Sequence, residues 1–310
     1  MKKSAIIALL LAGLVQVDAA PLRVAVLDFE DATGMKSDDR LGGAIAPGAL
    51  ADKGVYAIGK QLVNKEGFVL IDRRDFLAQM DQIRNLDMDA PTPARPSFLQ
   101  AAQALRADVV LRGTILSLST SKQLVNQGGY TADNSVMTLR VSVEALDAKD
   151  GTVIAVADGA SKFTVRQTEA LQTVLSEDDV LGMMDSALAK AIPPLEEALQ
   201  ARVEQLQARP TVKLTVKTTS EPAMVEIDGL LIGSTPIENF ELYKGDHILS
   251  ITKPGYQQIT KRVLFEKDTL VEAPMLREDL TAEEKKQVLD GAHIDVIDSS
   301  MPGLIIKSVE

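Results

Sequence analysis

The hydrophobic and polar positions in the first two thirds of the chain alternate between strand-like and helix-like patterns. Three short apolar runs rich in β-branched residues are typical of buried strands, at residues 22–29, 68–71 and 109–116. Apolar residues recur at helical spacing over residues 50–65, and Asp72 is a candidate N-cap for a second helix. Strands that alternate with helices predict a mixed sheet flanked by helices over residues 21–208.

A hairpin, a capped helix and two loops complete the prediction for this region. Residues 136–146 alternate apolar and polar side chains, and the turn sequence DAKDG at 147–151 leads to a partner strand. The proline-rich residues 89–96 predict a loop, and Ser97 predicts the start of another helix. The segment of residues 120–134 is polar and is also predicted to be a loop.

The pattern changes from helical to strand-like at Arg209-Pro210. Before this point a long helix begins near Ser176, and Pro193-Pro194 is expected to interrupt it because proline lacks the N–H that a helix interior needs. After it, residues 211–276 consist of short strands separated by turns, which predicts a small all-β domain. The fold class is therefore predicted to be α+β overall.

Residues 277–310 form the last predicted unit, a short helix followed by a β-hairpin. The helix is expected over residues 281–289, and the two hairpin strands over residues 294–297 and 304–306. The second of these strands is also a candidate for pairing with a partner protein, although pairing within its own chain is the commoner outcome.

The first twenty residues have the features of a secretory signal peptide. Lys2 and Lys3 precede an apolar run from Ser4 to Val15. The alternative is an N-terminal membrane anchor, but a helical span needs roughly 20 apolar residues, so we predict that residues 1–20 are cleaved. The sequence contains no cysteine to carry a lipid. We therefore predict a soluble periplasmic protein that has no membrane span and is not a lipoprotein.

The chain is acidic, with 33 Lys and Arg against 44 Asp and Glu and a formal net charge of −11. This balance argues against nucleic acid or an anionic membrane surface as a partner. The absence of cysteine excludes disulfides and thiolate metal sites, and two histidines are too few for a multi-histidine site. Tryptophan is absent and aromatic residues make up 4%, which argues against stacking sites for sugars. We predict no cofactor and no metal.

Three carboxylates follow the first predicted strand: Asp28, Glu30 and Asp31. Open α/β sheets place their sites at the carboxyl ends of strands, so these residues are candidates for metal ligation or acid–base chemistry. The alternative is a solvated strand exit whose carboxylates cap the next turn of backbone. We favour this alternative because no histidine lies nearby in sequence and the motifs assemble no nucleophile–base pair.

Arg73 and Arg74 follow the second predicted strand. Their guanidinium groups could clamp a carboxylate or a phosphate. The favoured alternative is that they solvate the first turn of a helix or pair with the neighbouring Asp72 and Asp75. His247 is likewise expected to make a structural hydrogen bond rather than to form a site.

Two nearby glycines, Gly229 and Gly233, raise the question of a phosphate-binding loop. A Walker loop has four residues between its glycines and a lysine after the second. Here three residues separate the glycines, no lysine follows, and Pro236 leads into a strand. We therefore interpret Asp228-Gly229 as a tight hairpin turn, and Pro236 as the start of a strand, where its missing N–H costs no ladder bond.

Four segments of the N-terminal region occur in the order RVAVLDFEDATG, EGFVLIDRRDF, ADVVLRGTILSL and LDAKDGTVI. Together they resemble the CsgG-type domain of bacterial envelope proteins. The resemblance implies an α/β domain over residues 21–208 that is not known as a catalyst and that self-associates in ring-forming relatives. The curli-secretion relative forms an outer-membrane pore through inserted hairpins. Residues 119–135 are too polar for such a hairpin, so pore formation is not carried over.

Five short segments stand out within residues 211–276. They are SEPA at 220–223, VEIDG at 225–229, GSTP at 233–236, GDH at 245–247 and KPGY at 253–256. Together they resemble a PEGA domain, a small β module named for its Pro-Glu-Gly-Ala motif. The segment Ser220-Glu221-Pro222-Ala223 departs from that motif, so the naming motif is degenerate here. The resemblance implies a recognition module, with Gly255 and Tyr256 in one of its turns.

These observations predict an exported, non-enzymatic binding or scaffold protein of the bacterial cell envelope. Its partners would be envelope proteins, whose assembly or export into a surface structure it assists, and self-association into a homo-oligomer is a further expectation. The alternatives left open are binding of peptidoglycan or an envelope polysaccharide, a hydrolase that uses the strand-end carboxylates, and an outer-membrane pore subunit. The candidate partner-binding or structural-motif positions are Asp28, Glu30, Asp31, Arg73, Arg74, Asp228, Gly229, Gly233, Pro236, Gly255 and Tyr256.

Overall fold

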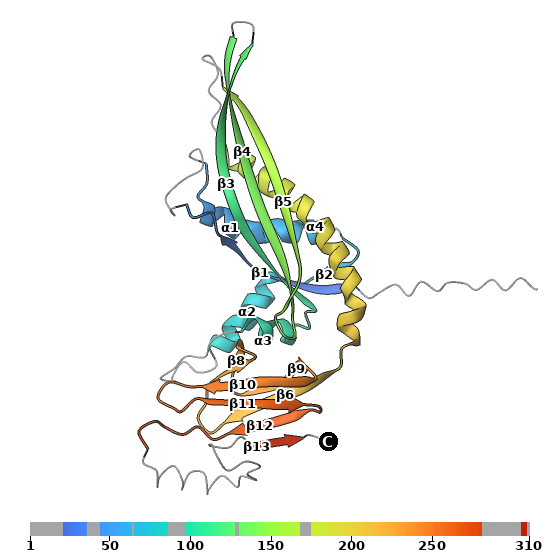
Figure 1. Cartoon of the computed structure of the whole chain (residues 1–310), viewed down its shortest axis with the longest axis vertical. Coiled ribbons are helices and arrows are strands. Elements are labelled where there is room, and N and C mark those ends of the chain that lie inside the picture. Colours follow the sequence, from blue (N-terminus) through green and yellow to red (C-terminus); the bar gives the residue numbers. More distant parts are fainter. Residues whose placement is uncertain are drawn as a thin grey trace, which may run out of the picture.

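The chain has the predicted α+β fold. The computed structural model describes residues 21–35, 44–63, 65–85, 97–127, 130–167, 175–280 and 305–308 (Figure 1). The N-terminal part is a mixed sheet with helices, and the C-terminal part is built from two sheets. The predicted signal peptide at residues 1–20 and the predicted loop at residues 89–96 lie outside the described residues.

The N-terminal part is organised around one five-stranded sheet. Its strands are β1 (Leu22–Asp31), β2 (Phe68–Leu70), β3 (Val109–Gln127), β4 (Tyr130–Asp147) and β5 (Val153–Gln167). Its helices are α1 (Pro47–Val63), α2 (Arg73–Asn85), α3 (Phe98–Ala104) and α4 (Glu177–Ala208). The strand order is β2-β1-β3-β4-β5, in which β1 runs parallel to β2 and β3, and β3, β4 and β5 pair antiparallel.

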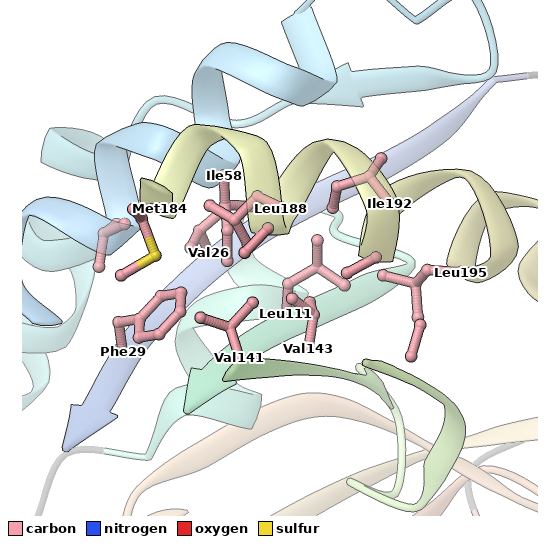
Figure 2. Close-up of a cluster of buried hydrophobic side chains, with 14 of the residues drawn as sticks. Val26, Phe29, Ile58, Leu111, Val141, Val143, Met184, Leu188, Ile192 and Leu195 are labelled. Atoms are coloured by element: carbon pink, nitrogen blue, oxygen red, sulfur yellow. The ribbon is translucent and has the colours of Figure 1, made fainter. Parts of the chain in front are cut away.

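Helices α1 and α4 cover one face of this sheet and form the main hydrophobic core with it. Figure 2 shows four side chains of α4 that lie over the strands: Met184, Leu188, Ile192 and Leu195. Their helical spacing places them on one stripe of α4. Phe29 of β1 fits between α1 and β3 because Gly54 and Gly113 leave room for its ring; a Cβ atom at either glycine would overlap that ring.

Helices α2 and α3 pack against part of the opposite face and form a smaller core there. This core includes Phe76 of α2, Ala101 and Ala102 of α3, and Val110 of β3. In Figure 1 the two helices lie between the five-stranded sheet and the C-terminal part. Both cores of the N-terminal part therefore use the same sheet, from opposite sides.

The polar segment predicted as a loop at residues 120–134 is instead part of a long hairpin, so that prediction is wrong. Strands β3 and β4 stay paired through it, and Gln127 lies opposite Tyr130. Main-chain hydrogen bonds form the ladder whatever the side chains are, so polarity alone does not exclude a strand.

The interruption predicted at Pro193-Pro194 is also wrong, because α4 continues past both prolines to Ala208. Ile192 and Leu195 flank the prolines and are buried against the sheet. This tertiary packing keeps the segment helical although the prolines lack N–H donors. In the described part of the chain, no helix combines the length and the apolarity that crossing a membrane requires.

The C-terminal part consists of two four-stranded sheets that face each other across one core. Its strands are β6 (Thr211–Thr218), β7 (Met224–Ile227), β8 (Leu230–Ser234), β9 (Ile237–Tyr243), β10 (Gly245–Thr252), β11 (Ile259–Phe265), β12 (Thr269–Ala273) and β13 (Ile305–Ser308). The sheet orders are β11-β10-β7-β8 and β13-β12-β6-β9. Every second residue of β6, β7 and β12 is buried, as expected for a sheet with one face toward a core.

The end of the chain pairs with this part of the molecule. Strand β13 lies antiparallel to β12, with Ile306 opposite Val271. It occupies nearly the position predicted for the second hairpin strand, residues 304–306. The predicted helix at 281–289 and the predicted first hairpin strand at 294–297 lie outside the described residues.

Candidate binding site at the junction of the two parts

The carboxylates at the end of β1, Asp28, Glu30 and Asp31, are exposed at the sheet surface. Asp31 Oδ1 accepts a hydrogen bond from the Thr33 N–H (2.9 Å) and so caps the turn that follows. The surrounding protein desolvates Asp28 and raises the pKa of its carboxyl; Arg112 opposes this rise and Glu30 adds to it. Among the described residues, no group of three or more His, Asp or Glu side chains could hold a metal ion.

The two arginines after β2 have different surroundings. Arg73 Nη1 donates to the carbonyl oxygens of Leu27 (2.7 Å) and Val26 (3.3 Å), so it ties the start of α2 to β1. Arg74 is exposed and lies beside Asp72, with 3.7 Å between its Nε and Asp72 Oδ1. One guanidinium therefore holds main chain and the other faces solvent.

The turn at Asp228-Gly229 joins β7 to β8, as predicted. Both residues have positive φ, 52° and 82°, as a two-residue type I′ hairpin turn requires. Asp228 Oδ1 accepts from the Ile248 N–H (2.8 Å), and Asp228 Oδ2 lies 2.6 Å from His247 Nδ1. His247 Nε2 lies 2.9 Å from the carbonyl oxygen of Tyr243. The histidine therefore makes structural hydrogen bonds with both ring nitrogens, and this prediction is confirmed.

The SEPA and KPGY segments meet at one corner of the C-terminal part. Ser220 Oγ donates to Tyr256 Oη (3.2 Å), and Lys253 Nζ donates to the carbonyl oxygen of Glu221 (3.1 Å). Lys253 is buried, and its ammonium lies 5.6 Å from the centre of the Tyr256 ring. Gly255 turns the chain between these residues with a φ of 78°, which glycine adopts without strain. The two segments therefore hold each other in place.

Gly233 and Pro236 lie at the end of β8 and before β9. Pro236 immediately precedes β9, where it was predicted, and is exposed. Gly233 lies against α3 of the N-terminal part, since a Cβ atom at this position would overlap Gln100 Oε1. This close approach belongs to a junction between the two parts that the sequence did not reveal.

Helix α3 is shared by the hydrophobic cores on both sides of the junction. Leu99 is 0% exposed and belongs to the core of the C-terminal part, whereas Ala101 belongs to the smaller core of the N-terminal part. Phe98 packs against both. Ser97 is the predicted N-cap, and its Oγ donates to the carbonyl oxygen of Leu231 (2.9 Å) in β8. Apolar and polar contacts therefore fix α3 against the C-terminal part.

Gln103 closes the free edge of β9, the outer strand of the sheet β13-β12-β6-β9. Its Nε2 donates to the carbonyl oxygen of Glu241 (2.8 Å), and its Oε1 accepts from the Glu241 N–H (2.8 Å). The same Nε2 also donates to the carbonyl oxygen of Ala148 (3.2 Å). One carboxamide thus satisfies both main-chain groups of an edge residue, as a neighbouring strand would.

A buried tyrosine–aspartate pair lies further along β9. Tyr243 Oη donates to Asp147 Oδ2 (2.6 Å), and both residues are buried. Burial raises the pKa of Asp147, although the hydrogen bonds from Tyr243 and from the Lys149 N–H oppose the rise. Burial and the contact with Asp147 also raise the pKa of Tyr243, so the phenol remains a donor. Arg209 of the linker covers the Tyr243 ring, with its Cζ 3.6 Å from the ring centre.

A groove of about 550 Å³ opens beside these contacts, between α2, α3 and the first half of β9. Its walls carry the carboxamides of Gln79, Gln100, Gln103 and Asn239 and the charged groups of Arg106, Asp108, Lys149 and Glu238. Gln100 Oε1 is buried and finds no hydrogen-bond partner among the described residues. The groove therefore suits a polar ligand that donates and accepts hydrogen bonds.

Most of the C-terminal part matches one known family. Residues 211–276 match the PEGA domain. The PEGA domain therefore comprises β6 to β12, and β13 lies beyond it. Comparison with curated proteins finds no match for the chain.

Several solved structures are similar to the chain at low identity. Lipoprotein GNA1162 from Neisseria meningitidis is 14% identical with a TM-score of 0.30, covering 60% of this chain and 99% of that one. The PelC dodecamer from Paraburkholderia phytofirmans is 16% identical with a TM-score of 0.28, covering 57% and 88%. The LpoB C-terminal domain from Salmonella enterica is 14% identical with a TM-score of 0.26, covering 49% and 89%.

These matches contradict the localisation predicted from the sequence, a periplasmic protein that is not a lipoprotein. GNA1162 is described as a lipoprotein, and so are further matched structures. The absence of cysteine bears on one kind of lipid attachment and does not by itself place a protein in a compartment. The predicted localisation is therefore withdrawn.

Sequence reasoning missed the residues that dock the PEGA domain. For Leu99 a signal existed, because the helix SFLQAAQALRA carries apolar residues on more than one side, which indicates two packing partners. For the Gln103–Glu241 and Tyr243–Asp147 contacts there was no signal, because each joins polar residues about 100 or more positions apart. The structure brings these together, while the predicted strand-end carboxylates stay outside the junction.

Proposed function

We propose that the chain is a non-enzymatic binding and scaffold protein of the bacterial cell envelope, which assists the assembly or export of a surface structure by contacting other envelope proteins. In this proposal residues 21–208 form a CsgG-like domain, and the linker Arg209-Pro210 joins it to the PEGA domain. The CsgG-like domain acts as the platform, and the PEGA domain is the recognition module.

One observation carries the proposal: several residues that the motifs single out are engaged in hydrogen bonds within the chain. Arg73 bonds to the main chain of β1, Asp228 contacts His247, and Tyr256 accepts from Ser220. Side chains committed in this way stabilise the framework. Recognition is then left to strand edges and to the exposed sheet faces.

The outer face of β10 and β11 in the PEGA domain favours a protein as the partner. Ile248 and Leu264 are 49% and 61% exposed there. Asp246 and Arg262 form an ion pair on the same two strands, with 2.6 Å between Arg262 Nε and Asp246 Oδ2. Aliphatic side chains beside a pair of opposite charges suit a modest protein contact with a polar rim.

The junction groove favours a second candidate function, binding of peptidoglycan or an envelope polysaccharide. Its carboxamides and charged groups can donate to and accept from sugar hydroxyls. The buried Oε1 of Gln100 would accept one such hydrogen bond.

Photocrosslinking in growing cells tests the first candidate. A photoreactive residue at Leu264 should capture specific envelope proteins, and the same residue at Tyr56 of α1, which is 73% exposed, serves as the matched control. Identical captures at the two positions would contradict a PEGA-directed protein contact. Retention of the purified protein on murein sacculi, lost on Gln79→Ala and Asn239→Ala substitution, would instead support the glycan.

A further inference from the structure

Strand β13 completes one edge of the sheet β13-β12-β6-β9 with only four residues. It pairs antiparallel with β12, from Thr269 opposite Ser308 to Glu272 opposite Ile305. On its other side β12 pairs in parallel with β6 of the PEGA domain. If β13 left, β12 would become an edge strand with a row of unpaired main-chain groups.

The described side chains of β13 add little to the packing. Ile306 lies opposite Val271 in the ladder but is 46% exposed, whereas Val271 is 0% exposed. Lys307 Nζ lies 2.9 Å from Glu272 Oε2 in an exposed ion pair. Neither Ile306 nor Lys307 belongs to the core of the PEGA domain. Main-chain pairing and one surface ion pair are therefore what hold Ile306 and Lys307 of β13.

Strand β12, in contrast, is packed into the core of the PEGA domain. Thr269, Val271 and Ala273 are buried in the PEGA domain. The carbonyl oxygen of Ala273 also accepts from the Thr219 N–H (3.2 Å). The edge that β13 covers is consequently preformed, and a preformed edge costs a ligand little ordering of the protein.

We propose that the edge of β12 is a docking site for an extended segment of a partner protein, and that β13 is an internal competitor which the partner displaces. The inference rests on the proposed protein-binding function and gives it a location. The partner adds a strand antiparallel to β12, with its own main chain replacing that of β13.

The side chains of β13 indicate the chemistry of the partner segment. The position opposite Val271 takes an aliphatic residue, and the position near Glu272 takes a cation, as Ile306 and Lys307 do. The net charge of −11 on the chain also favours a basic partner over an acidic one. The fitting ligand is therefore an extended segment that is aliphatic and basic.

The connection through residues 281–304 makes β13 a competitor at a fixed effective concentration. A partner then binds only to the fraction of molecules in which β13 has left the edge, and its apparent affinity falls by that fraction. Variants that remove β13 from the edge should therefore tighten binding without any change in the site itself.

A labelled peptide of residues 303–310, GLIIKSVE, probes the edge in trans by fluorescence anisotropy. The protein is the full chain, as wild type and as the variant Ile306→Pro/Lys307→Pro. Successive N–H groups point to opposite sides of a strand, so one of the two prolines removes a ladder donor. We expect the peptide to bind the variant at least about tenfold more tightly than the wild type. Equal binding, or no binding to either protein, would overturn the proposal.

A disulfide switch supplies a second test that does not depend on proline. Leu270 and Lys307 lie opposite each other, and the chain has no native cysteine to interfere. In the variant Leu270→Cys/Lys307→Cys, oxidation should lock β13 in place and abolish peptide binding, and reduction should restore it. Equal peptide binding to the oxidised and the reduced variant would show that the peptide binds away from the β12 edge, and would overturn the proposal.

Two controls separate this inference from its competitors. Glu272→Lys in the double-proline variant should weaken binding of the labelled peptide. A peptide carrying Lys307→Glu should bind this Glu272→Lys variant with the affinity restored. Light scattering should give the same mass for wild type and variant; a wild-type dimer that the prolines dissociate would mean exchange of β13 between two copies and would overturn the proposal. Specific photocrosslinks at Leu264 would support the proposed function even if the peptide did not bind. That combination of results would contradict only the docking site at β12.

Discussion

The three strands β12-β6-β9 have two outer edges, and the chain closes them differently. At β9, the carboxamide of Gln103 bonds to both main-chain groups of Glu241, and Tyr243 is buried against Asp147. At β12, the short strand β13 forms the outer strand, and its Ile306 is half exposed. Side chains that also belong to the body of the molecule close the first edge, and a strand of four residues closes the second. If β13 is displaced as proposed, the second edge opens alone, whereas the first opens only if the two parts separate.

The largest effect is expected from Leu99→Ala, which removes the apolar contact between α3 and the PEGA domain on the β9 side of the sheet. Leu99 is fully buried in the PEGA core although it belongs to α3. Loss of a buried leucine side chain should lower the free energy of unfolding by about 2–5 kcal/mol. Denaturant unfolding measures the change. Leu77→Ala on α2, where the side chain is 40% exposed, is the matched control and should cost far less.

A smaller effect is expected from Gln103→Ala, which reopens the β9 edge without touching the apolar contact. The substitution leaves the N–H and carbonyl oxygen of Glu241 to water, because both bonds lie at an exposed edge, and should cost about 0.5–1.5 kcal/mol in the same assay. Gln103→Glu keeps an acceptor for the Glu241 N–H and loses the donor, so an intermediate cost is expected. A Glu variant as stable as the wild type would show that the Nε2 bonds contribute nothing.

A pH-dependent effect is expected at Asp147, which lies at the same edge. Burial raises the pKa of Asp147 in the folded state above its unfolded value of about 4. The folded state then binds this proton more tightly, so the contribution of Asp147 is greatest below about pH 4 and declines as pH rises through the raised pKa. Asp147→Asn does not titrate. In thermal unfolding, the stability of the wild type relative to this variant should fall between acid and neutral pH. A difference in unfolding temperature that does not change with pH would contradict the raised pKa of Asp147.

The smallest effect is expected at the β12 edge. Lys307→Ala removes one exposed ion pair with Glu272 and should change the free energy of unfolding by about 0–1 kcal/mol. The effect should shrink further at high salt, because an exposed pair is screened. Hydrogen exchange should nevertheless show faster exchange in β12 while β9 keeps its protection. Equal increases in the exchange rates of β12 and β9 would show that the two edges do not differ in how they are held.

The sequence predicted those features that depend on neighbouring residues. Asp228-Gly229 turns where positive φ is needed, Ser97 caps α3, and the helix-to-strand change falls at Arg209-Pro210. Each of these follows from the chemistry of a few adjacent residues. Local reasoning also located the PEGA domain, because its turns recur within a short stretch of chain.

Local reasoning failed where distant residues decide the outcome. Pro193-Pro194 stays helical because the sheet holds the flanking apolar side chains, and the polar hairpin at residues 120–134 stays paired through its main chain. The Gln103–Glu241 contact at the candidate site joins one polar side chain to main-chain groups that no periodicity connects. Such contacts appear only once the fold has brought α3 and β9 together.

The position of Leu99 has a consequence for biosynthesis. The PEGA core is discontinuous in sequence, because one of its buried side chains is made more than a hundred residues before β6. A chain that emerges N-terminus first therefore displays Leu99 and the adjoining face of α3 to solvent until the strands up to β12 have been translated. The docking of the two parts is a late event with a large separation between its partners, so it should be the slow step of folding and the stage most exposed to aggregation.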